Sequence, residues 1–212
     1  MKICINAGHT LKGDGSGAIG LKNESEENRK VASEVIKLLS VGGNVVIESK
    51  VDSANSNKEY LSKCVDIANK SKADLFVSIH FNAFDGSAYG VEALIYNDKS
   101  GSKELATKIC NSVEKLGFKN RGVKIRPELY VLKNTFMDAI IVECCFIDNS
   151  GDMNKYDYKL MAKAIVEGLV GKIEQERLYR VCIGSYKNRD NANKAMIEAK
   201  NKGYKDSFIS IN

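Results

Sequence analysis

The chain has 212 residues, of which 43% are hydrophobic and 28% charged, a balance that indicates one full globular domain with a small appendage. A single proline excludes collagen-like and proline-rich classes, and no apolar stretch approaches the roughly 20 residues needed to cross a bilayer. The net charge of +5 is a mild excess without a run of five basic residues, so we expect neither nucleic acid nor a membrane as a partner.

Strand-like and helix-like segments alternate along residues 1–173. Short apolar or alternating runs predict strands at 2–6, 44–48, 74–79, 90–96, 128–132 and 139–143. Apolar residues at helical spacing predict helices at 23–40, 56–71, 101–116 and 153–173. This alternation predicts an α/β fold with a largely parallel sheet that helices cover on both faces. In open sheets of this kind, ligand sites form beyond the carboxyl ends of the strands.

Both histidines of the chain lie at predicted strand ends. His9 follows the first strand through a short Ala-Gly step, and His80 directly follows the strand at 74–79. Glu143 ends the apolar run at 139–143, where a carboxylate is costly unless it is paired, hydrogen-bonded or metal-bound. A structural role is the alternative for each residue alone, and a buried salt bridge is the alternative for the glutamate. Two imidazoles with a carboxylate suit zinc, which in catalytic sites takes three protein ligands and one water.

The third ligand must come from elsewhere, and the acidic start of the helix at 23–40 offers three candidates. Glu24 lies seven residues, or about two helical turns, before Val31 and therefore shares the inward face. Glu27 lies one turn before Val31 and is the second choice, whereas Glu26 points roughly the opposite way. Favourable charge at a helix N-terminus is the alternative explanation for this cluster.

Other site chemistries find no support in the sequence. The six cysteines show no CxxC spacing, which argues against a cysteine zinc cage. The glycine-rich loop after His9 lacks the GxxxxGK[ST] pattern of a phosphate-binding loop, and no GxSxG motif of a serine hydrolase occurs.

Four blocks of the chain, in order, resemble the motifs of zinc-dependent N-acetylmuramoyl-L-alanine amidases of the type 3 family. They are INAGHTLKGDGSGAIGLKNE at 5–24, SIHFNA at 78–83, NRGVK at 120–124 and IVECCFIDN at 141–149. The resemblance implies a mixed, mainly parallel six-stranded sheet flanked by helices, with residues 1–173 as the catalytic domain. It also implies one Zn²⁺ per chain bound by His9, Glu24 and His80, and Glu143 as the catalytic carboxylate. Asn82 and Arg121 are candidates for the substrate groove, with loop hydrogen bonding as their alternative role.

The C-terminal segment has a pattern of its own. After a polar linker at 174–177, residues 178–212 predict a small strand–helix–strand (βαβ) segment that resembles the first half of a SPOR module. This resemblance implies binding to peptidoglycan. About 35 residues are fewer than the roughly 40 at which a domain usually folds without help. We therefore expect the segment to dock on the catalytic domain or to form a homodimer through residues 178–212, and we favour the homodimer.

The resemblance implies a hydrolase that cleaves the amide between N-acetylmuramic acid and L-alanine of peptidoglycan by means of zinc-activated water. A zinc peptidase or carboxypeptidase of the cell wall, or a wall-binding protein without catalysis, is the alternative. No signal-peptide pattern occurs at the start of the chain, which favours a phage endolysin over a host autolysin. We accordingly expect a cytoplasmic protein that acts at the bacterial cell wall after its release.

Overall fold

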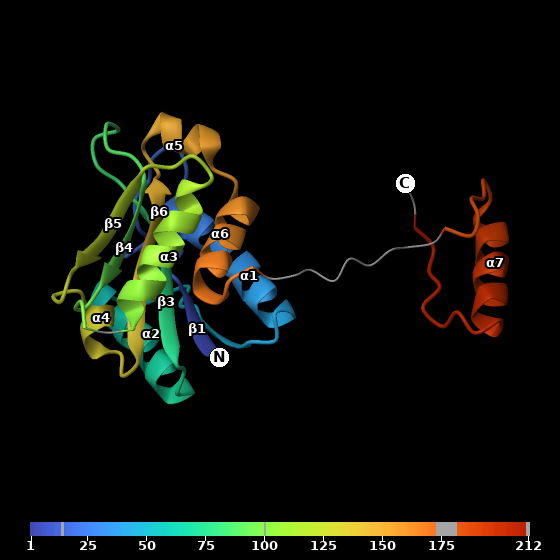
Figure 1. Cartoon of the computed structure of the whole chain (residues 1–212), viewed down its shortest axis with the longest axis horizontal. Helices are drawn as coiled ribbons and strands as arrows, with labels where there is room; N and C mark the ends of the chain where they lie inside the picture. The colour runs from blue at the N-terminus through green and yellow to red at the C-terminus, as the bar shows by residue number, and fades with distance from the viewer. Residues whose placement is uncertain (14, 100, 173–181, 211–212) are drawn as a thin grey trace. The chain divides into compact units, whose positions relative to one another are not determined.

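The computed structural model describes residues 1–13, 15–99, 101–172 and 182–210 (Figure 1). The contacts divide the chain into two compact units, Met1–Gln175 and Glu176–Asn212, which are described separately below. Among the described residues, no helix combines the length and the apolar character that spanning a membrane requires.

A six-stranded sheet forms the centre of the first unit, with the strand order β2-β1-β3-β6-β4-β5. Four of the neighbouring pairs run parallel, and β4 runs antiparallel to β6. The prediction of a mixed, mainly parallel sheet is therefore confirmed. The strands are β1 (Lys2–Ala7), β2 (Val45–Ser49), β3 (Leu75–Asn82), β4 (Val91–Ile95), β5 (Asn120–Ile125) and β6 (Asp138–Phe146).

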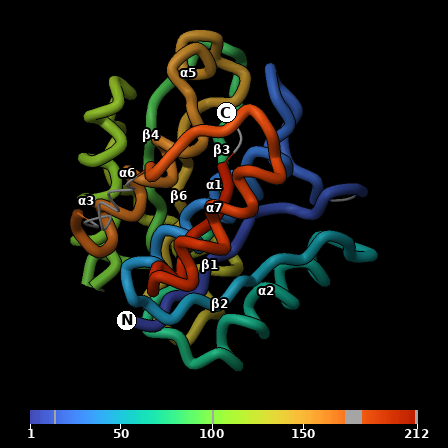
Figure 2. Tube along the Cα trace, turned by 90° about the vertical axis from the view of Figure 1, so that its right-hand side faces the viewer, coloured from blue at the N-terminus to red at the C-terminus, as the bar shows by residue number. Residues whose placement is uncertain are grey.

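Helices cover both faces of this sheet (Figures 1 and 2). One face packs against α1, α3 and α6 and contains the larger hydrophobic core. The other face packs against α2 and α4 over a smaller core. The helices of this unit are α1 (Glu24–Val41), α2 (Asn57–Ser71), α3 (Ser102–Glu114), α4 (Tyr130–Asn134), α5 (Ser150–Lys155) and α6 (Tyr158–Val170).

The prediction of a strand at 128–132 is wrong, because the helix α4 begins at Tyr130 and continues to Asn134. Val131 and Leu132 are consecutive and both buried in the same core, which a helix allows but a strand with one covered face does not. The strand that pairs with β4 at this edge of the sheet is β5, and it was not predicted. It is an edge strand without a fully buried residue, so its sequence lacks the apolar pattern by which strands are found.

The helix predicted at 153–173 is two helices. The chain leaves α5 at Tyr156, and the Asp157 side chain then accepts hydrogen bonds from the backbone N–H groups of Lys159 and Leu160, both at 2.9 Å. These bonds satisfy the free amides at the start of α6, so Asp157 caps a new helix.

Strands β3 and β6 extend further than the apolar runs predicted. His80 consequently lies inside β3 and not after it, Glu143 lies inside β6 and not at its end, and the two residues pair directly with each other in the parallel register. Ladder hydrogen bonds therefore hold the backbone of both residues, which gives their side chains a rigid base.

In the second unit the predicted helix is present as α7 (Arg189–Asn201), with Asn188 as its N-cap. The βαβ prediction requires a correction, since the described residues 182–188 and 202–210 form no strand, and residues 178–181 and 211–212 lie outside the described residues. A strand is stable only when it pairs, and two strands with one helix offer few partners.

Candidate metal centre

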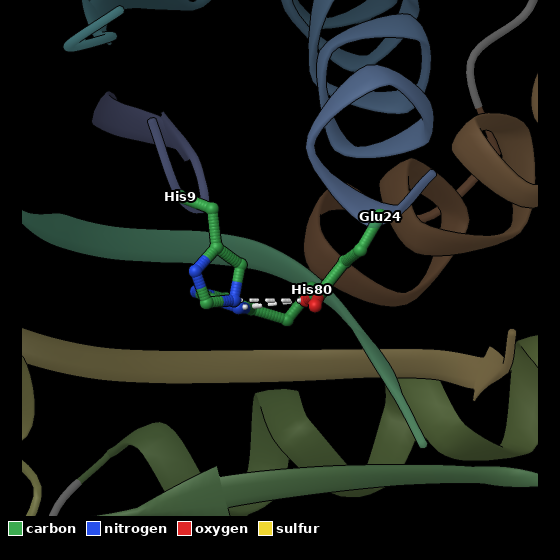
Figure 3. Close-up of side chains that lie close together, drawn as sticks. All are labelled: His9, Glu24 and His80. Carbon is green, nitrogen blue, oxygen red and sulfur yellow. Dashed lines mark hydrogen bonds and ion pairs between the residues drawn. The ribbon is translucent and has the colours of Figure 1, made fainter. Parts of the chain in front are cut away.

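Three side chains that are far apart in the sequence meet at the carboxyl end of the sheet (Figure 3). His9 lies just beyond β1, Glu24 is the first residue of α1, and His80 lies near the end of β3. Each offers one ligand atom, and these three atoms all lie within 4.8 Å of one another. Oε1 of Glu24 lies 3.1 Å from Nε2 of His9 and 3.3 Å from Nδ1 of His80.

The backbone at His9 is strained and firmly held. Its φ of +66° is a left-handed conformation that non-glycine residues rarely adopt. The His9 N–H donates to the Tyr60 hydroxyl at 2.6 Å, and Arg29 donates to the His9 carbonyl at 3.1 Å. Nδ1 of the ring lies 2.8 Å from the Gly15 carbonyl. This contact places the ring proton on Nδ1 and leaves Nε2 free to bind a metal.

Glu24 is buried and oriented by two backbone amides. The N–H of Ala18 donates to its Oε2 at 2.8 Å, and the N–H of Phe81 donates to its Oε1 at 3.1 Å. The other two acidic candidates point elsewhere. Glu26 is exposed, and Glu27 pairs instead with Lys30 at 2.8 Å and with the Tyr156 hydroxyl at 3.0 Å.

Two glycines let the three candidate ligands approach one another. A β-carbon at Gly8 would lie 2.4 Å from the His80 ring. A β-carbon at Gly17 would lie 2.8 Å from both Glu24 and His9, and the φ of +79° at this position also favours glycine. The glycine-rich loop after His9 therefore serves close packing around the ligands.

The charges of the three groups suit metal binding. Burial alone would raise the pKa of Glu24, but hydrogen bonds from His80 and His9 hold it well below its usual range. Burial lowers the pKa of His80 despite its bond to Glu24. Burial alone would also lower the pKa of His9, but Glu24 and the Gly15 carbonyl raise it above its usual value. Glu24 is thus ionised and His80 neutral, as ligands must be, and a metal would compete with a proton for Nε2 of His9.

The residues present fit a divalent metal. Zinc ligands at about 2.1 Å in a tetrahedron lie about 3.4 Å apart, close to the distances that separate Glu24 from the two histidines. Two imidazole nitrogens and one carboxylate oxygen form a set of three ligands, and such a set leaves the fourth position open for water.

Glu143 lies beside this centre, because its position on β6 pairs with His80 on β3. Its Oε2 atom is buried and has no hydrogen-bond partner among the described residues. Burial, followed by the charges of Glu24 and Glu92, raises the pKa of Glu143 to about 8. A carboxyl group in this state exchanges a proton near neutral pH, which is what a general acid–base requires.

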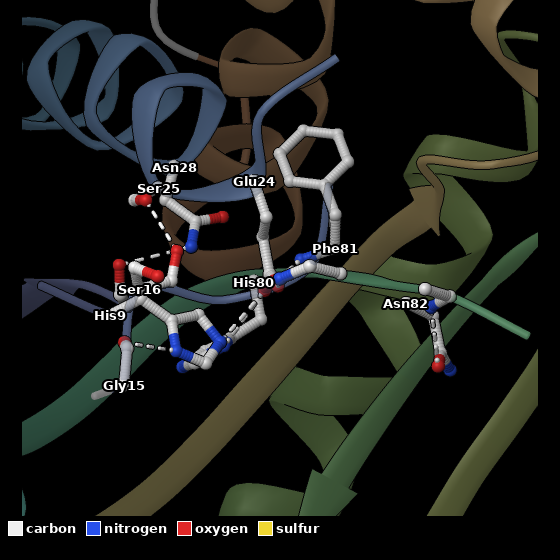
Figure 4. A network of polar contacts seen from close by, with 12 residues as sticks. His9, Gly15, Ser16, Glu24, Ser25, Asn28, His80, Phe81 and Asn82 are labelled. Carbon is white, nitrogen blue, oxygen red and sulfur yellow. Dashed lines mark hydrogen bonds and ion pairs between the residues drawn. The ribbon is translucent and has the colours of Figure 1, made fainter. Parts of the chain in front are cut away.

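The two predicted groove residues are brought together by a third residue that sequence analysis missed. Glu92 accepts a hydrogen bond from Asn82 Nδ2 at 3.0 Å and from Arg121 Nε at 2.8 Å. Figure 4 shows that His80 and Asn82 project from one side of β3 and Phe81 from the other. A signal for Glu92 existed in the sequence, since it is the charged residue within the predicted strand GVEALIY.

Two family models match the chain. The model described as N-acetylmuramoyl-L-alanine amidase matches residues 3–175, and the model described as SPOR domain matches residues 157–210. The SPOR match therefore begins within the first unit, before the segment predicted at 178–212.

Several curated proteins are similar in sequence. An uncharacterized protein of Clostridium perfringens is 36% identical over 186 residues, which cover 84% of this chain and 54% of the relative. The endolysin of Bacillus phage SPP1 is 34% identical over 160 residues, which cover 71% of this chain and 56% of the endolysin. The amidase LytC of Bacillus subtilis is 33% identical, with 79% of this chain and 34% of LytC covered. This chain thus spans about half the length of the first two relatives and a smaller share of the third.

Solved structures agree in fold. The catalytic domain of the CD27L endolysin targeting Clostridia difficile has a TM-score of 0.76 and 32% identity, with 81% of this chain and 98% of that chain covered. The CwlD amidase of Clostridioides difficile, solved with the GerS lipoprotein, has a TM-score of 0.70 and 28% identity, with 79% and 95% covered.

Proposed function

Because the chain belongs to the N-acetylmuramoyl-L-alanine amidase family, we propose that it hydrolyses the amide between N-acetylmuramic acid and L-alanine in peptidoglycan. The observation that carries this proposal is the convergence of His9, Glu24 and His80, whose ligand atoms lie within 4.8 Å of one another, beside Glu143. A wall-binding protein without catalysis would have no need of this set.

We propose that the three converging residues hold one zinc ion. When bound, zinc lowers the pKa of a coordinated water to about 7 and polarises the substrate carbonyl. The contribution of the chain is to fix the ligands, which it does through the Gly15 carbonyl on His9 and the amides of Ala18 and Phe81 on Glu24.

Glu143 is the proposed acid–base residue. It accepts a proton from the attacking water and passes it to the leaving nitrogen of L-alanine, so that one water is consumed and an acid and an amine are released. Its buried, unpartnered Oε2 supports this role, because no hydrogen bond from the described residues competes for the proton. Asn82 and Arg121 would line the groove beside it, held by Glu92.

We propose an endolysin role in host lysis, with a cytoplasmic protein that reaches the wall after release. The similarity to the endolysin of phage SPP1 supports this role, whereas the similarity to LytC supports a host autolysin. Expression in a susceptible bacterium separates the two. An endolysin should cause lysis only when a membrane-permeabilising protein is expressed with it, and lysis without such a protein would contradict this role.

The C-terminal unit is the proposed wall-binding module, an assignment that the SPOR match supports. We also propose that two copies pair through residues 178–212, since the described part of this unit exposes large apolar side chains. They include Ile183, Ile197 and Tyr204. A monomeric mass in solution at micromolar concentration would contradict the dimer, and removal of the unit should weaken binding to purified walls.

Identification of the released product tests the main function. Purified walls digested by the zinc-loaded protein should yield free peptides with N-terminal L-alanine and intact glycan strands. Release of free amino acids or internal peptide fragments would instead indicate a zinc peptidase or carboxypeptidase. Binding to walls without any product would indicate a wall-binding protein without catalysis.

A further inference from the structure

A row of charged side chains crosses the sheet away from the metal ligands. Glu143 on β6 pairs with His80 on β3, and on its other side it pairs with Glu92 on β4. Residues that pair directly across strands project from the same face of the sheet, about 5 Å apart. Two carboxylates therefore face each other, an arrangement that is destabilising unless one of them is compensated.

Of the two carboxylates, Glu92 is the one whose oxygens both accept hydrogen bonds from described residues. Each of its oxygens has a partner, since Arg121 Nε donates to Oε2 at 2.8 Å and Asn82 Nδ2 donates to Oε1 at 3.0 Å. Its side chain is only 12% exposed. Glu143, by contrast, keeps a buried oxygen without a partner among the described residues. Glu92 is therefore occupied in holding Arg121 and Asn82, and it is not available for proton transfer.

Arg121 is held in place but not covered. Its Nε is bound to Glu92, and its guanidinium lies 5.0 Å from the centre of the Phe146 ring. The side chain nevertheless remains 33% exposed. Its two Nη atoms make no hydrogen bond to any residue in the described part of the first unit. A guanidinium fixed in this way presents a fork of donors that matches a carboxylate.

The positions of the charged groups in the substrate indicate which group Arg121 would bind. In the proposed reaction the muramic acid carboxyl is part of the scissile amide, and the N-acetylated sugars carry no charge. The free carboxylates of the substrate consequently lie on the peptide, on the leaving side of the bond. We propose that Arg121, positioned by Glu92, binds a carboxylate of this acidic peptide and so determines specificity, an inference that rests on the proposed function.

The test compares two soluble muropeptides of equal length, one with free peptide carboxylates and one with these groups amidated. The zinc-loaded full chain should cleave the free form with a kcat/KM at least about 10-fold higher, mainly through a lower KM, because a charge-assisted hydrogen bond is lost on amidation. Arg121→Ala should cleave the two forms equally, and Arg121→Lys should keep part of the preference.

Glu92→Gln tests the positioning role. This variant should reduce the preference through a higher KM for the free form, whereas a merely structural role would slow both substrates by the same factor. Lys108→Ala is the control for removal of a basic side chain, since Lys108 lies on α3 and pairs with Glu104. It should retain the preference, and retention of the preference in Arg121→Ala would overturn the assignment.

The outcomes for the unmodified chain separate this inference from the function. Equal cleavage of both muropeptides would overturn the carboxylate subsite and leave the amidase activity in place. Cleavage of neither by zinc-loaded protein would overturn the proposed function and the subsite with it.

Discussion

Gly8 and His80 are in such close contact that a β-carbon at position 8 would lie 2.4 Å from Cε1 and Nε2 of the imidazole. We therefore predict that Gly8→Ala displaces His80 and abolishes stoichiometric zinc binding, as measured by metal analysis after dialysis. Gly13→Ala is the control in the same loop, because a β-carbon there would meet no atom within 4 Å, although Gly13, unlike Gly8, has a positive φ. Zinc retained at one ion per chain in Gly8→Ala would contradict this packing.

Matched variants test which acidic residue of α1 binds the metal. Glu24→Gln should lose zinc, because it removes the charge that both histidines face, whereas Glu26→Gln should keep it, because Glu26 is exposed. Both substitutions are conservative and lie within one helical turn. Metal analysis of the two variants, together with His80→Ala, gives the ligand set. Normal zinc content in Glu24→Gln would exclude this residue as a ligand.

Removal of the proposed acid–base group should separate catalysis from metal binding. Glu143→Gln should retain zinc but hydrolyse walls about 10²- to 10⁴-fold more slowly, the usual contribution of general acid–base catalysis. The measurement is the initial rate of turbidity loss, with zinc content determined on the same sample. A rate near that of the unmodified protein would show that another group transfers the proton.

The same residue should give the metal-free protein a characteristic dependence of stability on pH. Glu143 ionises near pH 4.5 in the unfolded chain and at a pKa of about 8 in the folded state. Between these values the folded state binds more protons, so its stability falls as pH rises from 4.5 to 8 and levels off above.

Glu143→Gln removes this effect. The difference in the free energy of unfolding between the variant and the unmodified metal-free chain should increase by about 2 kcal/mol, in favour of the variant, from acidic to mildly alkaline pH. This value is smaller than the full pKa shift would give, because the side chain is partly exposed. Urea denaturation in the presence of a chelator, at both ends of the range, measures it. If the free energies of unfolding of the two proteins changed with pH in the same way, Glu143 would ionise normally.

The hydroxyl of Tyr60 supports the strained backbone at His9, whose N–H donates to it at 2.6 Å. Tyr60→Phe should lower the free energy of unfolding by about 1 kcal/mol, because a partly buried donor loses its partner. It should also weaken zinc affinity about 10-fold, as loss of an outer hydrogen bond at a metal site typically does. Tyr130→Phe is the control at an exposed position, and competition with a chromogenic chelator measures the affinity. Equal affinities would assign Tyr60 to packing alone.

Much of the fold follows from local pattern. Buried strands such as β1 and β3 are continuous apolar runs, and α1 shows helical spacing with its own N-cap, so their positions could be predicted from neighbouring residues. Which acidic residue at the start of α1 points inward could be predicted in the same way. The spacing from Val31 selects Glu24 as the inward residue, and the structure brings this residue, with His9 and His80, to one point.

The remainder depended on contacts between residues far apart in the sequence. The edge strand β5 has little apolar surface and forms only because β4 pairs with it, and the helical form of α4 follows from the core that it covers. The position of Glu92 opposite Glu143 results from the antiparallel insertion of β4 beside β6. Local sequence determines which side chains lie on one face of an element, but register between strands is set by the packing of the whole sheet. For that reason the sequence, together with its family resemblance, could name His9, Glu24 and His80 as candidate ligands, whereas the pairing of Glu92 with Arg121 was decided by the tertiary structure.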